Sequence, residues 1–506
     1  MRFIHIARSA VLNWFATAST LLVSYFLAPF LIHRLGNIEY GIWVLALSTT
    51  GYLYLLDLGL RSSVLRFVSR AHAAGDHDEA SRIVSAVLWV RLMIGGLILL
   101  IATILSTCFP RLFRLPEELW TSSRQALFII GLTISLTMPM SAIGAVLSAL
   151  NRYDLQSYIS LLQLAIRSAG IVLVVHWGKG IVGIAVCELV AALTSNVVMV
   201  TITRHIYPEL RIRLKIPSGR VLRPLWSYGS YSFILLVSLQ LVYQADNLIV
   251  GIFVSAAGVT LYSIGNSLCR YSQQLFSAVT NTFVPVASVY ESSGAQARLR
   301  ALYLNGTRAV LVLSLPVLLT LIIRAQSFIS LWIGPQYSRP SGRVTTVLTL
   351  ALMLAVINST ASSIAIGIEK HKLVAIWALF EASLNLLLSI VLVRKMGLMG
   401  VALGTLVPSI IINLVLWPLY IPRILEVRRS EFFTAILAPV GLCAGPFAVA
   451  SLLANTYLPP RSMTGFLCQT VVLLAIFYIT VFAFYWDSVK NELFPRMKQV
   501  IVGVRE

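Results

Sequence analysis

Fourteen long apolar stretches fill almost the whole of this 506-residue chain, and they constrain its fold more than any other feature. An α-helix needs about 20 consecutive apolar residues to cross the hydrocarbon core of a bilayer. The runs are continuous rather than alternating, which excludes the strands of a transmembrane barrel. The sequence therefore predicts an all-α polytopic membrane protein with about 14 transmembrane helices. The expected spans are 11–33, 41–60, 83–108, 124–150, 157–176, 181–204, 226–253, 259–290, 302–324, 344–368, 373–393, 400–421, 433–455 and 465–486.

The net charge of +20 is distributed unevenly among the connections between these spans. With the N-terminus placed in the cytoplasm, the cytoplasmic segments hold 24 Lys and Arg residues and the opposite side holds 11. Because basic connections favour the cytoplasmic side, both termini are expected there. No basic patch is interleaved with aromatic residues, so the charge indicates membrane topology and not nucleic-acid binding.

The sequence lacks the motifs of a disulfide framework, a metal site or a catalytic centre. The five cysteines are scattered over the apolar spans without a CxxC pair, and none of the seven histidines belongs to an HExxH motif. Residues 178–183 spell G-x-G-x-x-G, but they lie in a turn between two spans and not in the βαβ unit that a dinucleotide site requires. We therefore expect no enzymatic activity, no metal and no cofactor.

The chain contains an internal repeat with an offset of 217 to 219 residues. The matched segments are 180–185 (GIVGIA) with 397–402 (GLMGVA), 150–155 (LNRYDL) with 368–373 (IEKHKL), and 65–75 with 284–294. Because six spans fall in each copy, both copies begin on the same side of the membrane and the repeats are parallel.

This repeat predicts two six-helix lobes around a central cavity, followed by two helices outside the repeat. The expected domains are an N-terminal lobe (1–210), a basic cytoplasmic linker (211–225), a C-terminal lobe (226–425), and two extra helices with a cytoplasmic tail (426–506). Segment 61–82 is too polar to span but places apolar residues on one helical side, so it is expected to form an amphipathic helix at the membrane interface.

Polar residues at helical spacing mark one face of several spans. Hydrocarbon makes such side chains expensive, so these faces are expected toward a wet cavity or, alternatively, toward hydrogen-bonding neighbour helices. The eighth span carries the longest stripe, with Arg270 near its middle. The candidate cavity residues are Arg91, Arg167, Arg270, Asn266, Gln273, Asn281, Asn13, Gln240 and Tyr243.

The charged residues within the spans indicate what kind of cargo the cavity would hold. A guanidinium group binds two phosphate oxygens with its planar fork and keeps its charge at any working pH. A cavity with Arg91, Arg167 and Arg270 therefore favours an anionic or phosphorylated substrate. The carboxylates in spans are Glu188, Asp246 and Glu381, which are expected to carry a coupling ion or to form ion pairs, for example Asp246 with Arg270.

Several loose motifs of this chain are those of a known transporter family. They are Arg34-Leu-Gly36-Asn-Ile-Glu39-Tyr40-Gly41-Ile-Trp43, Leu56-Asp57-Leu-Gly59-Leu with Val64 and Arg66, Ala74-Gly75 with Glu79, and Tyr243…Asp246-Asn247 leading to Gly258…Tyr262. Together with the two-by-six repeat and the two extra helices, they resemble the Wzx-type polysaccharide (O-antigen and exopolysaccharide) flippases. These flippases belong to the multidrug/oligosaccharidyl-lipid/polysaccharide exporter superfamily.

The resemblance implies a flippase that moves an oligosaccharide linked to polyprenyl pyrophosphate across the bacterial inner membrane by alternating access. It implies a role in surface polysaccharide assembly, such as lipopolysaccharide or exopolysaccharide. The implied partners are the lipid-linked oligosaccharide, membrane lipids, a polysaccharide polymerase and glycosyltransferases. The alternatives are a cation-coupled multidrug antiporter or a lipid II flippase of the same superfamily, and a membrane scaffold that transports nothing.

Overall fold

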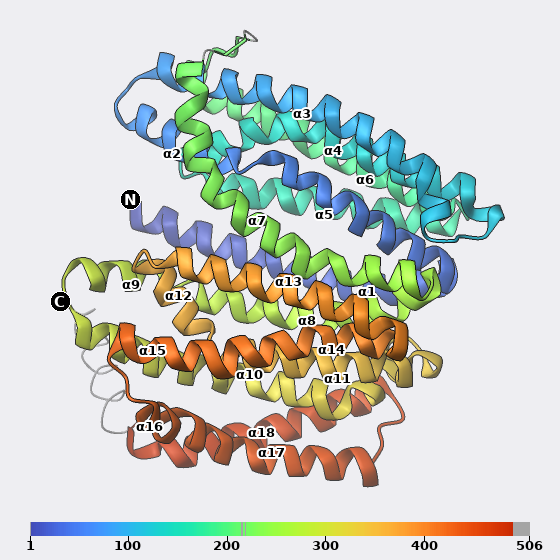
Figure 1. Cartoon of the computed structure of the whole chain (residues 1–506), viewed down its shortest axis with the longest axis vertical. Coiled ribbons are helices and arrows are strands. Elements are labelled where there is room, and N and C mark those ends of the chain that lie inside the picture. The colour runs from blue at the N-terminus through green and yellow to red at the C-terminus, as the bar shows by residue number, and fades with distance from the viewer. Residues whose placement is uncertain (1, 214–215, 218, 489–506) are drawn as a thin grey trace. The chain divides into compact units, whose positions relative to one another are not determined.

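The computed structural model describes residues 2–213, 216–217 and 219–488, and these residues form helices and short connections without a strand (Figure 1). The first part of the chain forms α1 (Arg2–Gly51), the 3-10 helix η1 (Tyr52–Asp57), α2 (Leu60–Ala73), α3 (His77–Leu112), the 3-10 helix η2 (Glu117–Leu119), α4 (Trp120–Ala149), α5 (Tyr153–His176), α6 (Gly180–Ile206) and α7 (Gly219–Phe253). It continues with α8 (Ala256–Thr280), α9 (Phe283–Ser292), α10 (Gln296–Trp332), α11 (Pro335–Ile357), α12 (Ser359–Gly367) and α13 (His371–Met396). The last part forms α14 (Leu398–Ile410), the π-helix η3 (Ile411–Leu416), α15 (Trp417–Leu425), α16 (Arg429–Phe432), the π-helix η4 (Phe433–Leu437), α17 (Ala438–Tyr457) and α18 (Met463–Ser488).

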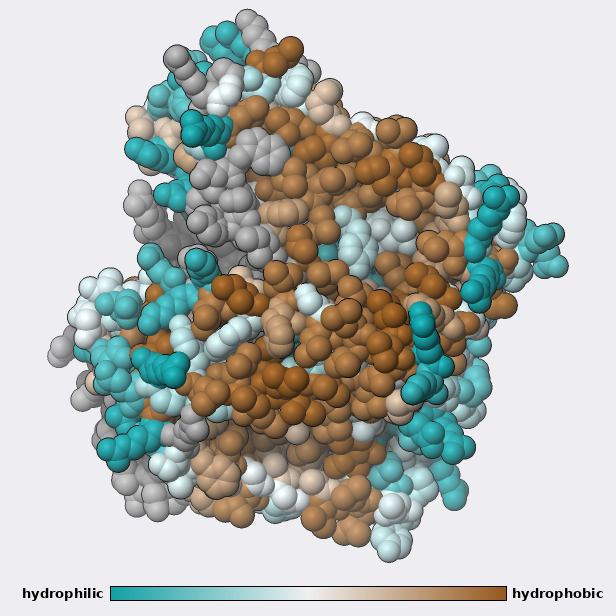
Figure 2. Space-filling view, viewed as in Figure 1, coloured by the Kyte–Doolittle hydropathy of each residue, from teal (hydrophilic) through white to brown (hydrophobic). Residues whose placement is uncertain are grey.

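The predicted all-α membrane fold is confirmed. Within the described residues, 11 helical segments are long and apolar enough to cross a membrane. Large apolar side chains are exposed along them, including Phe26 at 69% and Val471 at 64%. Figure 2 shows such side chains covering the middle of the visible helices, with hydrophilic residues gathered at the helix ends. The 14 expected spans fall on helical parts of the chain, but three of them, 41–60, 259–290 and 344–368, run across a break between helices. The number of crossings stays a prediction.

The first two expected spans are joined by a short turn. The segment α1 holds the first span and the beginning of the second, and the chain reverses at Gly36, where φ is 75° and ψ is 175° (Figure 1). That region of backbone conformation is open almost only to glycine, because a Cβ atom would clash. The glycine therefore fixes where the first helical hairpin turns.

The described helices group into two compact units. The first unit contains Met1–Ser263 and Ala378–Val401, and the second contains Ile264–Trp377 and Ala402–Glu506. In the first unit, α3 packs along α4, α4 along α6, and α5 along α6 and α1. In the second unit, α10 packs along α11 and against α17, which in turn packs on α18. This grouping does not test the lobe boundaries expected from the sequence, which stay a prediction.

The backbone reproduces the repeat found in the sequence. A left-handed residue stands at the matched position of each repeated turn: Gly75 (φ 72°) and Gly294 (φ 64°), Asn151 (φ 56°) and Glu369 (φ 60°), Gly180 (φ 54°) and Gly397 (φ 55°). Such residues are uncommon in proteins, and Asn and Gly adopt this conformation more readily than Glu. The coincidence at three pairs supports two copies of one helical pattern.

The helix α2 differs from its expected place at the membrane interface. Its apolar side chains Leu60, Val64 and Val68 are fully buried, because α2 packs on α3, α4 and α7 within the first unit. The Ser63 hydroxyl also donates a hydrogen bond of 2.8 Å to the carbonyl of Leu225. The amphipathic pattern is real, but the apolar face packs on protein instead of lipid.

The beginning of the predicted linker is fixed to α3. The backbone N–H groups of Arg211 and Arg213 donate to the hydroxyls of Ser81 and Ser85 at 3.0 and 2.9 Å. Just before them, the Tyr207 hydroxyl lies 2.7 Å from His77 Nδ1. Burial raises the pKa of the Tyr207 phenol, and the nearby carboxylates of Glu209 and Asp76 raise it further. The chain thus leaves α6 along a defined path.

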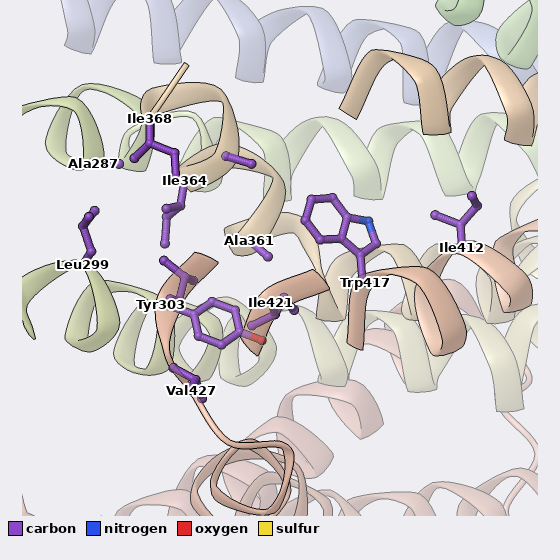
Figure 3. Packing of buried hydrophobic residues seen from close by; sticks show 12 residues of the cluster. Ala287, Leu299, Tyr303, Ala361, Ile364, Ile368, Ile412, Trp417, Ile421 and Val427 are labelled. Atoms are coloured by element: carbon purple, nitrogen blue, oxygen red, sulfur yellow. The ribbon is translucent and has the colours of Figure 1, made fainter. Parts of the chain in front are cut away.

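The core of the second unit is built where several helices are interrupted (Figure 3). Buried residues of α9, α10, α12, η3 and α15 form one apolar cluster, in which Tyr303 stacks on Phe432 at 5.6 Å between ring centroids. Beside it, α11 ends at Asn358, whose Nδ2 donates 2.9 Å to the carbonyl of Asn413 in η3. Polar side chains therefore satisfy the backbone where the helical hydrogen-bond pattern changes.

Close packing of α3 on α4 provides a test of this fold. A Cβ atom at Gly131 would lie 2.2 Å from the Cβ of Ala102, whereas one at Gly96 on α3 would meet nothing within 4 Å. We expect Gly131→Leu to lower the free energy of unfolding by about 1–3 kcal/mol through overpacking, seen as a lower melting temperature of the solubilised protein. Gly96→Leu is the matched control and should change the melting temperature little. Equal effects of the two variants would contradict this packing.

Candidate functional site

Arg91 is enclosed within the first unit. Its side chain on α3 is fully buried, and Nη2 donates to the Asp57 carboxylate at the end of η1. Its Nη1 also donates 2.6 Å to the hydroxyl of Ser141 on α4. These contacts tie three elements together and favour a structural role in this conformation. The substrate-binding role expected for Arg91 stays a prediction.

Arg167 and Glu188 form an accessible ion pair near the middle of α5 and α6. The Nε of Arg167 lies 2.5 Å from Oε1 of Glu188, and the two side chains are 37% and 18% exposed. The pair combines a charge at membrane depth with a surface that another molecule can reach.

The polar residues of α7 mainly hold neighbouring helices, as the alternative interpretation of the stripes expected. Gln240 Nε2 donates 3.0 Å to the carbonyl of Gly51, and Asn247 Nδ2 donates 3.0 Å to the Ser48 hydroxyl. The Asp246 carboxylate is 5% exposed and accepts a hydrogen bond of 2.6 Å from the hydroxyl of Tyr262. The side chain of Tyr243 lies outside the described ones.

The polar side chains at helical spacing on α1 form hydrogen bonds mainly to the backbone of the same helix. Asn13 is exposed, and its carbonyl accepts a hydrogen bond of 2.9 Å from the Thr17 hydroxyl. The Thr20 hydroxyl bonds to the carbonyl of Ala16 in the same way, at 2.8 Å. Such bonds remove the need for a partner helix or a cavity beside these threonines.

The polar residues predicted to line one side of α8 lie next to the buried side of this helix, which packs in the second unit. Cys269, Ser272 and Phe276 are buried, and Cys269 Sγ lies 3.3 Å from the Thr349 hydroxyl on α11. The stripe residues Asn266, Arg270 and Gln273 are half-buried, while Asn281 is exposed and follows the last residue of α8. Arg270 belongs to the second unit, and Arg91 and Arg167 belong to the first. A cavity shared by the three arginines stays a prediction, as does pairing of Arg270 with Asp246.

Glu381 stands apart from the other carboxylates in spans. It is half-buried on α13, and among the described side chains no Lys or Arg forms an ion pair with it. Glu188 has the counter-charge of Arg167, and Asp246 accepts a hydrogen bond from the neutral hydroxyl of Tyr262. The role of Glu381 as a coupling group stays a prediction.

Two charged residues with defined contacts were not among the candidates. Asp57 was noted within a motif of the resemblance, and it is the partner of Arg91. Arg324 stands at the end of an expected span, yet it is fully buried against α18. The sequence shows that charged residues occur in or at the ends of apolar spans, but it does not show which neighbouring helix each of them contacts.

The comparisons with known proteins settle the family. Residues 35–341 match the family described as "Polysaccharide biosynthesis protein". The chain belongs to this family. It is 26% identical over 498 residues to the "Uncharacterized membrane protein EpsK" of Bacillus subtilis, covering 95% of this chain and 96% of that protein. It is also 21% identical over 220 residues to the "Probable low-salt glycan biosynthesis flippase Agl15" of Haloferax volcanii, covering 44% of this chain and 46% of that protein.

Solved structures show the fold of this family member. The lipid II flippase MurJ in an inward closed conformation matches with a TM-score of 0.75 at 16% identity, over 95% of this chain and 99% of that one. An inward-facing multidrug resistance MATE family transporter of the MOP superfamily matches with a TM-score of 0.69 at 13% identity, over 85% of this chain and 98% of that one. The fold expected from the resemblance is confirmed: the protein is a multi-pass membrane protein of the polysaccharide biosynthesis family, with the fold of these two transporters.

Proposed function

We propose that this protein flips an oligosaccharide linked to polyprenyl pyrophosphate across the inner membrane, for assembly of a surface polysaccharide. The observation that carries the proposal is the accessible ion pair of Arg167 and Glu188 at membrane depth. The family membership and the similarity to Agl15, which is described as a glycan biosynthesis flippase, support the same function. The proposal includes a bacterial location with both termini in the cytoplasm, and partners among the polymerase and glycosyltransferases of the same polysaccharide.

The ion pair suggests how a phosphate group would be taken up and released. Without cargo, Glu188 neutralises Arg167, which avoids an unpaired charge at membrane depth. A pyrophosphate group offers more negative charge and two oxygens for the guanidinium fork, so it can replace Glu188. Arg270, predicted from the sequence as a cavity residue, stays the second candidate to supply a positive charge to the head group, while the polyprenyl chain stays in lipid. Alternating access of the two repeats then carries the head group across.

Removal of these two arginines tests the proposal. A charge-assisted hydrogen bond contributes about 1.5–3 kcal/mol, so each of Arg167→Ala and Arg270→Ala should weaken cargo binding roughly 10- to 100-fold. We expect surface glycan to fall and the lipid-linked precursor to accumulate inside, with unchanged protein abundance. Arg152→Ala is the control, because Arg152 pairs with Asp154 at the start of α5, where the arginine side chain is 42% exposed. Full export by the Arg167→Ala, Arg270→Ala double variant would overturn the assignment.

A strain in which the gene for this protein is deleted or depleted separates the two alternatives within the superfamily. The fold is shared with a lipid II flippase and with multidrug transporters, so the fold alone does not choose between them. Altered resistance to cationic dyes with an intact surface glycan would favour a multidrug antiporter. Lysis on depletion, with lipid II retained inside, would favour a lipid II flippase.

A further inference from the structure

Arg324 is a buried arginine at the junction of α10 and α18 in the second unit. Its side chain is fully buried, and Nη2 donates to the Oε1 atom of Gln469 on α18. The guanidinium also lies 4.5 Å from the ring centroid of Phe466. These contacts hold the group in place, but both partners are uncharged.

The guanidinium has hydrogen-bonding capacity that the described side chains leave unused. Its Nε and Nη1 atoms are buried without a hydrogen-bond partner among the described residues, which also provide no ion pair for it. Arg91 and Arg167, by contrast, each have a carboxylate. A buried charge without a counter-charge is strongly unfavourable, so an anion from outside the chain would find a prepared partner here.

The site lies close to the end of the helices. Arg324 precedes the last residue of α10 by about two turns. Gln469 Nε2 donates 2.8 Å to the carbonyl of Leu458, the first residue after α17. Leu458 and its neighbour Tyr457 are 66% and 78% exposed. One amide side chain therefore connects the guanidinium to an exposed loop at the membrane face where α17 ends.

We propose that Arg324 binds a phosphate oxyanion at this face, with Gln469 as the movable group that covers it. When Gln469 turns away, Nη2 becomes free beside Nε and Nη1, and the planar donor set matches two oxygens of one phosphate group. Lipid headgroups and inorganic phosphate share this chemistry. The site is independent of the proposed transport function, because it needs neither the repeat interface nor the Arg167–Glu188 pair.

The test uses the purified full-length protein in a neutral detergent and measures its melting temperature. The probes are phosphatidylglycerol, diacylglycerol as a lipid without phosphate, and inorganic phosphate. We expect phosphatidylglycerol to raise the melting temperature of the wild type and of Arg461→Gln, which lacks an exposed arginine of the α17–α18 loop. Arg324→Gln should lose this response. A further response to inorganic phosphate would identify free anion as a ligand, and its absence would assign the site to lipid headgroups.

A second variant keeps the proposal testable if Arg324→Gln does not fold. Gln469→Ala removes the competing hydrogen bond, so half-saturation by the phosphate-bearing probe should occur at a roughly three- to tenfold lower concentration. If the Arg324–Gln469 hydrogen bond only holds α10 to α18, Gln469→Ala should lower the melting temperature without a gain in affinity for the phosphate-bearing probe. That result, or equal responses of wild type and Arg324→Gln, would overturn the proposal.

Discussion

Arg91→Met should lower the free energy of unfolding by about 3–5 kcal/mol, the largest single effect on stability that we expect. The variant leaves the Asp57 carboxylate, whose side chain is 16% exposed, without its counter-charge. It also removes the hydrogen bond from Nη1 to Ser141. The measurement is thermal or denaturant unfolding of the solubilised protein.

The partner variants separate the ion pair from simple packing. Arg91→Met combined with Asp57→Leu should recover much of the lost stability, because no unpaired charge remains. Ser141→Ala should cost less, about 1.5–3 kcal/mol, since it removes one hydrogen bond from the guanidinium and leaves the ion pair in place. If Arg91→Met alone unfolds at the wild-type temperature, the ion pair is not a structural element.

Glu381→Gln should abolish the response of transport to an imposed proton gradient. The amide has the shape of the carboxyl group but cannot take up or release a proton. Among the described side chains Glu381 has no ion-pair partner, so the carboxylate is available to a coupling ion. The measurement is cargo movement in proteoliposomes with and without the gradient.

Two further variants make this result specific. Glu117→Gln changes an exposed carboxylate of η2 and should leave gradient-driven transport intact. Glu188→Gln removes the partner of Arg167, so we expect it to change cargo binding and to leave the gradient response in place. Gradient-driven transport by Glu381→Gln at the wild-type rate would exclude this residue as the coupling group.

Hydropathy and turn residues predicted the fold well because they act locally. A run of apolar residues must be a helix in hydrocarbon whatever surrounds it. The repeated turns were visible as matched glycines and polar hinges, and their left-handed residues stand at the matched positions, such as Gly75 and Gly294. The turn between the first two spans was predicted between residues 33 and 41, and the structure places it at Gly36.

The partners of polar residues could be predicted much less well. Gln240 and Asn247 are polar residues at helical spacing in one expected span, a pattern that suggested a wet cavity. They instead form hydrogen bonds to residues of α1 about 190 to 200 positions earlier in the chain. Arg91 finds Asp57 because η1 brings that carboxylate back to α3. Such pairings depend on how each helix is rotated against its neighbours, and hydropathy fixes the rotation only to within a broad face.

The π-helix η3 lets one continuous helical segment serve two neighbours. Before it, the Ser409 hydroxyl donates 3.0 Å to the carbonyl of Ala351 on α11, and after it, Trp417 packs on Trp377 at 5.1 Å between ring centroids. A π turn holds more residues than an α turn, and each residue rotates an α-helix by about 100°. Deleting one residue within 411–416 would therefore swing Trp417 away from Trp377 while Ser409 kept its bond. The length of this segment therefore determines which side chains after it face Trp377, and not only whether a helix forms there.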